Sequence, residues 1–210
     1  MNQPGSYEIR PMEPADVPAV EAIERLSFPS PWPASSFLYE LQHGTHSSYH
    51  VLVKPEKRRT ERPSRGWRRW LRSVVTAPEK RRVIGYVGFR FQSSRVHIST
   101  IAVHPDWRGR GLGKLLLLTA MEKALERGSS VVSLEVRASN RVAQSMYRKY
   151  GFRFTSVHRG YYRDGEDAWL MEVQVNQDAT YRQLIKRRRT LIARLSHSQP
   201  DVGQNNRDTL

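Results

Sequence analysis

Short stretches of this chain alternate apolar with polar residues, and longer ones repeat apolar residues three or four positions apart. The first pattern predicts strands and the second predicts helices. The predicted strands are residues 7–10, 49–53, 83–91, 95–103, 131–136, 154–159 and 168–175, and the predicted helices are residues 14–26, 32–41, 115–127 and 142–150. The order β-α-α-β-β-β-α-β-α-β-β predicts a mixed α/β fold, in which 83–91 and 95–103 pair as a hairpin.

Positive charge is concentrated in two segments, although the whole chain carries a net charge of +15. Residues 54–82 contain 12 Lys or Arg against 3 Asp or Glu, and residues 176–210 contain 7 against 3. The remaining residues carry only +2. This distribution argues against a nucleic-acid-binding fold and favours an enzyme with two basic appendages.

Each appendage contains a helical pattern. In the first, apolar residues at helical spacing predict a short amphipathic helix whose other side is basic; they are Trp67, Trp70, Leu71, Val74 and Val75, opposite Arg65, Arg68, Arg69 and Arg72. Two interpretations remain open. The tryptophan face packs back onto the domain, or it docks on RNA, an acidic protein or anionic lipid. In the second appendage, residues 181–195 predict a terminal helix with a solvated charged face, and a disordered end follows Ser196.

Composition restricts the chemistry. The chain has 210 residues, of which 38% are hydrophobic, and no apolar run of about 18 residues, so we expect no transmembrane helix. The first residues lack the features of a secretory signal, which favours a cytoplasmic location. The absence of cysteine excludes disulfides, thiolate metal sites and an acyl-cysteine intermediate. We expect no metal site, because His43, His46 and His50 lie in a Gly/Ser/Thr-rich stretch typical of a solvated loop.

A glycine-rich segment, Arg108-Gly-Arg-Gly-Leu-Gly-Lys114, joins the strand ending at Val103 to the following helix. A strand, a glycine turn and a helix in this order point backbone N–H groups and the positive end of a helix dipole at one place, which suits a phosphate group. The spacing matches neither the nucleoside-triphosphate loop nor the dinucleotide fingerprint. It does match Arg-x-x-Gly-x-Gly, formed by Arg108, Gly111 and Gly113.

With this motif, the chain resembles the GNAT acetyltransferases. Further blocks are similar to the RimI-type N-terminal protein acetyltransferases of that superfamily, and they lie in the same order. These blocks are Ile9–Met12, Asp16–Pro18, Phe28-Pro29, Pro31-Trp32, Leu134–Asn140, Ala143, Tyr147, Gly151-Phe152, Tyr161-Tyr162, Glu166–Ala168 and Met171. The resemblance covers roughly residues 7–175. It implies a GNAT fold with a mixed sheet of about six to seven strands over residues 7–177, followed by a tail over 178–210.

The resemblance also implies that acetyl-CoA is the acetyl donor. The glycine turn would hold the pyrophosphate, and the pantetheine arm would lie between the strand ending at 101–103 and the strand 131–136, where these splay apart. A backbone N–H within 101–103 would polarise the thioester carbonyl. Asn140 would contact the cofactor, although a helix N-cap is its other interpretation. The expected cofactor-binding residues are Ile101, Ala102, Val103, Arg108, Gly109, Arg110, Gly111, Leu112, Gly113, Lys114 and Asn140.

Two side chains are candidates for proton transfer. Glu135 lies in an otherwise apolar strand, where partial desolvation makes a carboxylate more basic, so we expect it to be the general base. Its other interpretation is a structural glutamate that pairs with Arg137 or with the opposite helix. Tyr147 is the candidate acid, because a neutral phenol can protonate the departing thiolate. Its other interpretation is a core tyrosine on an amphipathic helix.

The expected acceptor is a protein α-amine, whose pKa of about 7.7–8.0 leaves roughly a tenth or more nucleophilic at neutral pH. Four aromatic residues would line its entry, unless each is ordinary packing: Phe28, Trp32, Tyr161 and Tyr162. We therefore expect an Nα-acetyltransferase acting on a protein N-terminus, with ribosomal proteins among the candidates. The alternatives are acetylation of a small amine or a lysine side chain, and a non-catalytic basic module associated with ribosomes or RNA.

Overall fold

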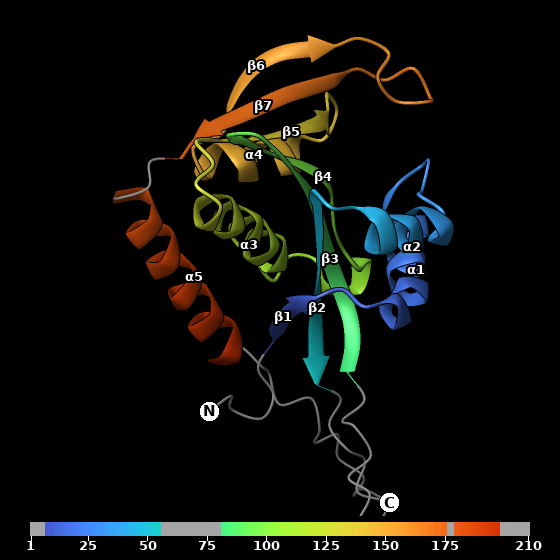
Figure 1. Ribbon diagram of the computed structural model, residues 1–210, viewed down its shortest axis with the longest axis horizontal. Coiled ribbons are helices and arrows are strands. Elements are labelled where there is room, and N and C mark those ends of the chain that lie inside the picture. The colour runs from blue at the N-terminus through green and yellow to red at the C-terminus, as the bar shows by residue number, and fades with distance from the viewer. Residues whose placement is uncertain (1–6, 56–80, 176–178, 198–210) are drawn as a thin grey trace, which may run out of the picture.

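The computed structural model of the chain describes residues 7–55, 81–175 and 179–197 (Figure 1). Its centre is a seven-stranded sheet in the order β1-β2-β3-β4-β5-β7-β6. The strands are β1 (Glu8–Pro11), β2 (Ser47–Pro55), β3 (Arg81–Gln92), β4 (Arg95–Val103), β5 (Val131–Arg137), β6 (Arg153–His158) and β7 (Ala168–Gln174). The helices are α1 (Val17–Ser27), α2 (Ala34–His43), α3 (Leu112–Glu126), α4 (Arg141–Lys149) and α5 (Ala179–His197), with 3-10 turns η1 (Pro14–Asp16) and η2 (Pro105–Trp107).

The predicted mixed α/β fold and the order of its elements are confirmed, and only the ends of elements differ. The helix predicted over 14–26 starts as the 3-10 turn η1, and α-helical geometry begins at Val17. A more consequential difference is that α3 begins at Leu112 rather than at residue 115. Glycine's low helix propensity conceals this start, yet Gly111 directly precedes the helix with a left-handed φ of +79°. The glycine motif therefore contains the first turn of α3.

Two antiparallel halves make up the sheet. Strands β1 to β4 form one half, and β5, β7 and β6 form the other. A parallel pairing of β4 with β5 joins them, and it runs only from Arg95↔Val131 to Ile98↔Leu134. Beyond this point β4 stays paired with β3 as far as Val103, while β5 stays paired with β7 as far as Arg137. The two strands therefore separate where the pantetheine arm is expected to lie.

Helices cover both faces of the sheet, with α1 and α2 on one side and α3 and α5 on the other (Figure 1). Each layer has its own apolar core. The larger core contains the buried leucines of α3 and also includes Tyr147 of α4 and Leu184 of α5. The smaller core lies under α1 and α2 and is centred on Phe37 and Tyr86. Apolar packing thus supports the sheet from both sides around the separation of β4 from β5.

The tail predicted as a helix is confirmed as α5, although its charged face is not simply solvated. Leu184 is buried against the larger core, and Arg188 forms an ion pair with Glu122 of α3. The amphipathic helix predicted around Trp67 lies outside the described residues, as does the end of the tail after residue 197. Within the described part of the chain, no helix is long and apolar enough to cross a membrane.

Candidate functional site

The glycine turn between β4 and α3 is shaped for a ligand that contacts backbone. Gly109 and Gly111 have φ angles of +76° and +79°, a region that side chains with a Cβ rarely adopt. The first N–H groups of a helix have no acceptor within the helix and carry its positive dipole end. Gly111 places those of α3, beginning at Leu112, at the turn itself. This arrangement suits an anion such as a pyrophosphate.

Arginines anchor the turn to the rest of the protein. Arg108 donates from Nε to the carbonyl of Val103 (3.0 Å) and from Nη2 to the hydroxyl of Ser27 (2.9 Å). Arg110 lies over the Trp107 ring, 4.7 Å from its centroid, and donates to the Asp106 carbonyl at 3.2 Å. Both guanidinium groups thus hold the loop in place. The motif had indicated only that these two arginines lie at the cofactor.

Glu135 lies where the two halves of the sheet separate. It directly follows Leu134, the last residue of β5 paired with β4, and its side chain is 14% exposed. His97 Nε2 lies 3.0 Å from one carboxylate oxygen, and His158 Nδ1 lies 3.9 Å from the other. The expected alternative partner Arg137 instead pairs with Asp164 and Glu166, so the interpretation of Glu135 as its partner is wrong.

His97 and His158 were not singled out from the sequence. His97 is fixed from two sides, because its Nδ1 lies 3.2 Å from the Ser133 hydroxyl while Nε2 donates to Glu135. A signal did exist, since His97 lies between Val96 and Ile98 in a buried strand, as Glu135 does between its own apolar neighbours. Only the register of the parallel pair shows that the two side chains meet.

Tyr147 lies on α4, and Asn140 is the residue that precedes this helix after the end of β5. Tyr147 is buried in the larger core, with its ring centroid 5.7 Å from that of Phe152. Burial raises the pKa of its phenol well above the usual value, and the nearby Tyr162 adds to the effect. Asn140 caps α4, since its side-chain oxygen accepts the Ala143 N–H at 3.1 Å. This cap uses only the oxygen of the amide.

The loop between β6 and β7 carries the predicted aromatic pair. Tyr161 is half exposed, and its ring packs edge-on against Tyr162 at 5.2 Å between centroids. The Arg137 guanidinium lies 3.9 Å from the Tyr162 ring centroid and pairs with Asp164 (2.9 Å) and Glu166 (2.6 Å). The loop is thus latched to the end of β5, close enough for Tyr161 and Tyr162 to interact electrostatically with the Glu135 carboxylate.

The other predicted aromatic pair lies in the loop between α1 and α2. Phe28 and Trp32 are partly buried against the smaller core, and the Trp32 ring lies 5.7 Å from that of Phe37. This loop and the β6–β7 loop project on the same side of the molecule (Figure 1). The structure thus gives both pairs a packing role and places both loops on one side.

A buried carboxyl that was not predicted ties this loop to the sheet. Glu24 accepts hydrogen bonds from the Tyr86 hydroxyl and from Thr100 Oγ1 (3.2 Å), and from the backbone of Trp32. Burial raises the pKa of Glu24 above its usual range. The α1–α2 loop is thereby fixed to β4 next to Ile101, which the sequence analysis placed against the cofactor.

The described residues contain no group of three or more His, Asp or Glu placed to hold a metal ion. Of the three histidines considered earlier, His43 and His46 are exposed. His50 is buried in β2 and stacks on Phe89 at 5.7 Å, so its assignment to a solvated loop was wrong. Burial lowers the pKa of His50 to about 4.

The chain belongs to the acetyltransferase (GNAT) family, whose sequence model matches residues 17–152. It is 32% identical to a Bacillus subtilis protein assigned as a ribosomal protein bS18-alanine N-acetyltransferase, over 80% of this chain and 96% of that protein. It is also 32% identical to an N-alpha-acetyltransferase of Sulfurisphaera tokodaii, over 79% of this chain and 91% of the relative.

The fold is shared with solved structures of the same family. The Escherichia coli ribosomal-protein-S18-alanine N-acetyltransferase superposes with a TM-score of 0.61 at 25% identity, over 81% of this chain and 94% of that one. Solved structures of this fold include complexes with acetyl-CoA and with CoA. The chain is therefore an N-acetyltransferase that uses acetyl-CoA as its acetyl donor.

Proposed function

We propose that this chain acetylates the N-terminal α-amine of a protein, with Glu135 as the general base. The observation that carries the proposal is the position of Glu135 at the separation of β4 from β5, beside two histidines and the tyrosine loop. The relatives named for N-alpha and ribosomal-alanine acetylation support the choice of acceptor. A ribosomal acceptor would place the reaction in the cytoplasm.

Acetyl-CoA would bind mainly through backbone groups. The N–H groups at Gly109–Gly113 would hold its pyrophosphate, and the amide nitrogen of Asn140 remains available to the cofactor. The pantetheine arm would enter between β4 and β5, because the pairing of β4 with β5 ends at Ile98. A backbone N–H within Ile101–Val103 would then polarise the thioester carbonyl and stabilise the oxyanion that forms on it.

Proton transfer would use Glu135 of β5 and Tyr147 of α4. Glu135 takes a proton from the ammonium, directly or through one water, and the freed amine attacks the thioester carbon. His97 holds the carboxylate in position, so it acts as a positioning residue. When the tetrahedral intermediate collapses, the C–S bond breaks and Tyr147 donates its proton to the leaving thiolate. Burial keeps the Tyr147 phenol protonated before this step. The nitrogen, now part of the amide, loses its second proton through water, and this proton restores the Tyr147 phenol.

The acceptor peptide would enter between the α1–α2 loop and the β6–β7 loop. Phe28 and Trp32 would line one side, and Tyr161 and Tyr162 the other. These aromatic side chains would thus select the first side chain of the acceptor peptide, while the α-amine of that residue reaches Glu135. An α-amine needs less help than a lysine, whose pKa is about 10.4, so one carboxylate is sufficient.

The test is to measure CoA release with four classes of compound. The first is peptides with a free N-terminal Ala, Ser, Met or Gly, including the alanine N-terminus of bS18. The others are blocked peptides with an internal lysine, polyamines, and a peptide with no amine. We expect turnover with free N-termini and at least tenfold less with lysine peptides and polyamines. Turnover confined to lysine peptides or polyamines would overturn the proposal in favour of the alternative acceptors. If no acceptor released more CoA than the amine-free peptide, the remaining hypothesis would be the non-catalytic basic module.

We further propose that the basic segment 54–82 strengthens binding to ribosomes or RNA, because it holds a net charge of +9. Replacing Arg65, Arg68, Arg69 and Arg72 by Gln should weaken salt-dependent ribosome binding and leave turnover on short peptides unchanged. Unaltered ribosome binding at low salt would refute this role.

A further inference from the structure

Helix α5 lies outside the family-matched residues 17–152, yet it packs directly beside the glycine turn. A Cβ placed on Gly111 would lie 3.5 Å from Leu191 Cδ1 of α5, and one on Gly113 would lie 3.6 Å from Met146 Sδ of α4. The turn therefore sits between α4 and α5. The ion pair of Arg188 with Glu122 fixes α5 on α3, so the helix is a wall of this region.

A groove runs from the turn between α5 and the end of α4. It has a volume of about 490 Å³. From α5 it is lined by Lys186, Arg187 and Arg194 among others, and from the two neighbouring helices by Lys114 and Tyr150. Lys114 belongs to the first turn of α3, so the groove continues directly from the glycine motif.

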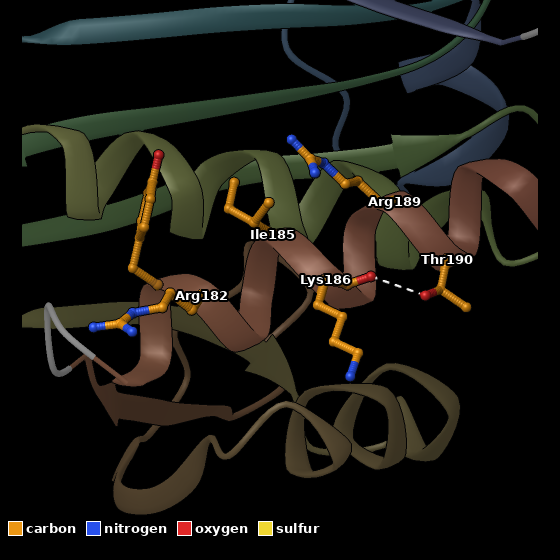
Figure 2. Close-up of a pocket in the computed structure, with 6 residues that line it drawn as sticks. Arg182, Ile185, Lys186, Arg189 and Thr190 are labelled. Atoms are coloured by element: carbon orange, nitrogen blue, oxygen red, sulfur yellow. Dashed lines mark hydrogen bonds between the residues drawn. The ribbon is translucent and has the colours of Figure 1, made fainter.

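The groove is strongly cationic. Four of its lining residues are Lys or Arg, and among the described residues that line it none is acidic. Arg187 lies close enough to Tyr150 to oppose the rise in the phenol's pKa that partial burial causes. Figure 2 shows Lys186 extending to one side of α5, while Ile185 and Arg189 extend to the other. Of the α5 cations, Lys186, Arg187 and Arg194 line this groove, whereas Arg182 and Arg189 do not.

We propose that this groove binds the 3′-phosphoadenosine end of acetyl-CoA, so that α5 is a third wall of the cofactor site. The inference rests on the proposed function only in taking the pyrophosphate to lie on the glycine turn. The 3′-phosphate would pair with Lys186 and Arg187, because a phosphate accepts strong charge-assisted hydrogen bonds from such groups. The adenine would pack against the Tyr150 ring. A groove of this volume lies within the usual range for small-molecule sites.

Calorimetric titration with CoA and with 3′-dephospho-CoA, which lacks only the 3′-phosphate, tests this directly. We expect the unaltered protein to bind CoA about tenfold more tightly, as charge-assisted contacts to one phosphate would produce. The double variant Lys186→Gln/Arg187→Gln should lose this preference while its affinity for 3′-dephospho-CoA stays the same. The matched control Arg182→Gln/Arg189→Gln removes equal charge from residues of α5 that do not line the groove, and should keep the preference.

The proposal is overturned if the groove variant keeps its preference for CoA, or if it loses equal affinity for both ligands. It is also overturned if the variant weakens binding of a short single-stranded RNA and leaves the preference for CoA intact, since α5 would then serve nucleic acid. Because titration needs no acetyl acceptor, a loss of the CoA preference stays meaningful even if every peptide proves inactive. The failure of the acceptor proposal and of this one are therefore separate results.

Discussion

The two halves of the sheet meet over only four residue pairs, and they contribute different kinds of chemistry. The half formed by β1–β4 ends in a strand edge and a glycine turn, so it offers mainly backbone N–H groups to a ligand. The half formed by β5, β7 and β6 offers side chains, namely Glu135, His158 and the tyrosines of the β6–β7 loop. His97 belongs to the first half, and its side chain contacts Glu135 of the second half.

This difference indicates a division of labour. Backbone groups do not titrate and their positions are set by the fold, which suits the binding of a constant cofactor. Side chains can gain or lose protons and differ in size, which suits proton transfer and the choice of acceptor. Substitutions in the two halves should therefore affect different kinetic parameters. Four predictions follow in order of their expected effect on turnover.

The largest effect is expected for Glu135→Gln. The amide keeps the shape of the carboxylate but cannot take a proton, so kcat should fall about 100- to 1,000-fold. The affinity for acetyl-CoA should stay within twofold, because the glycine turn that would hold the cofactor is unchanged. Steady-state kinetics and titration measure the two quantities. A kcat close to that of the unaltered protein would remove Glu135 from its role as base.

The converse separation is expected for Gly109→Ala. Gly109 has a φ of +76°, and no atom of the described residues lies within 4 Å of an added Cβ, so the methyl group has room there and only backbone strain opposes it. The new Cβ would stand where the pyrophosphate approaches, so the acetyl-CoA KM should rise about tenfold while kcat at saturation changes little.

The control for this prediction is Gly160→Ala in the β6–β7 hairpin. Gly160 also has a positive φ (+57°) and open space around it. Both variants should lose a similar stability, roughly 1–2 kcal/mol by thermal unfolding. Only the variant in the turn should weaken acetyl-CoA binding. Equal KM values for the two variants would contradict the placement of the pyrophosphate.

A smaller effect is expected for Arg137→Met, which removes the latch of the tyrosine loop. The loss of its ion pairs with Asp164 and Glu166 and of its contact with Tyr162 should raise the peptide KM about fivefold. The acetyl-CoA KM should not change. Arg153→Met, on strand β6, is a control for the loss of one surface charge. A rise in both KM values would show that the loop is not specific to the acceptor.

The smallest effect on turnover is expected for His50→Leu in the first half of the sheet. The pKa of His50 falls from 6.5 to about 4, so the folded protein resists protonation that the unfolded chain accepts. This contribution to stability is present above pH 6.5 and is lost as pH falls toward 4, by up to about 3 kcal/mol. Between pH 6.5 and pH 4, the free energy of unfolding of the variant should fall less than that of the unaltered protein. If the free energy of unfolding changed with pH equally in both proteins, His50 would not be a buried neutral histidine.

The fold and much of the site could be predicted from sequence because the relevant signals are local. Apolar periodicity is produced by residues a few positions apart, and the glycine motif determines its own backbone geometry. The placement of Glu135 in a buried strand likewise needs only its apolar neighbours. Asn140 shows the same point, since its predicted N-cap depends on the Ala143 N–H three residues away.

The contacts of the candidate site were beyond the sequence, because they join segments far apart in the chain. The register of β4 on β5 alone brings His97 to Glu135, and the hairpin register brings His158 there. Likewise, the burial of Glu24 against Tyr86 depends on how α1 packs on the sheet.

What the sequence by itself determined is the class of this protein: a mixed α/β acetyltransferase with a glycine turn suited to a phosphate and a carboxylate in a buried strand. The tertiary structure alone decided which partners each charged group has. Arg137 latches a loop instead of neutralising Glu135, and α5 lies along the glycine turn instead of extending into solvent. The physical reason is that local conformation depends on neighbouring residues, whereas ion pairing and burial depend on packing between distant segments.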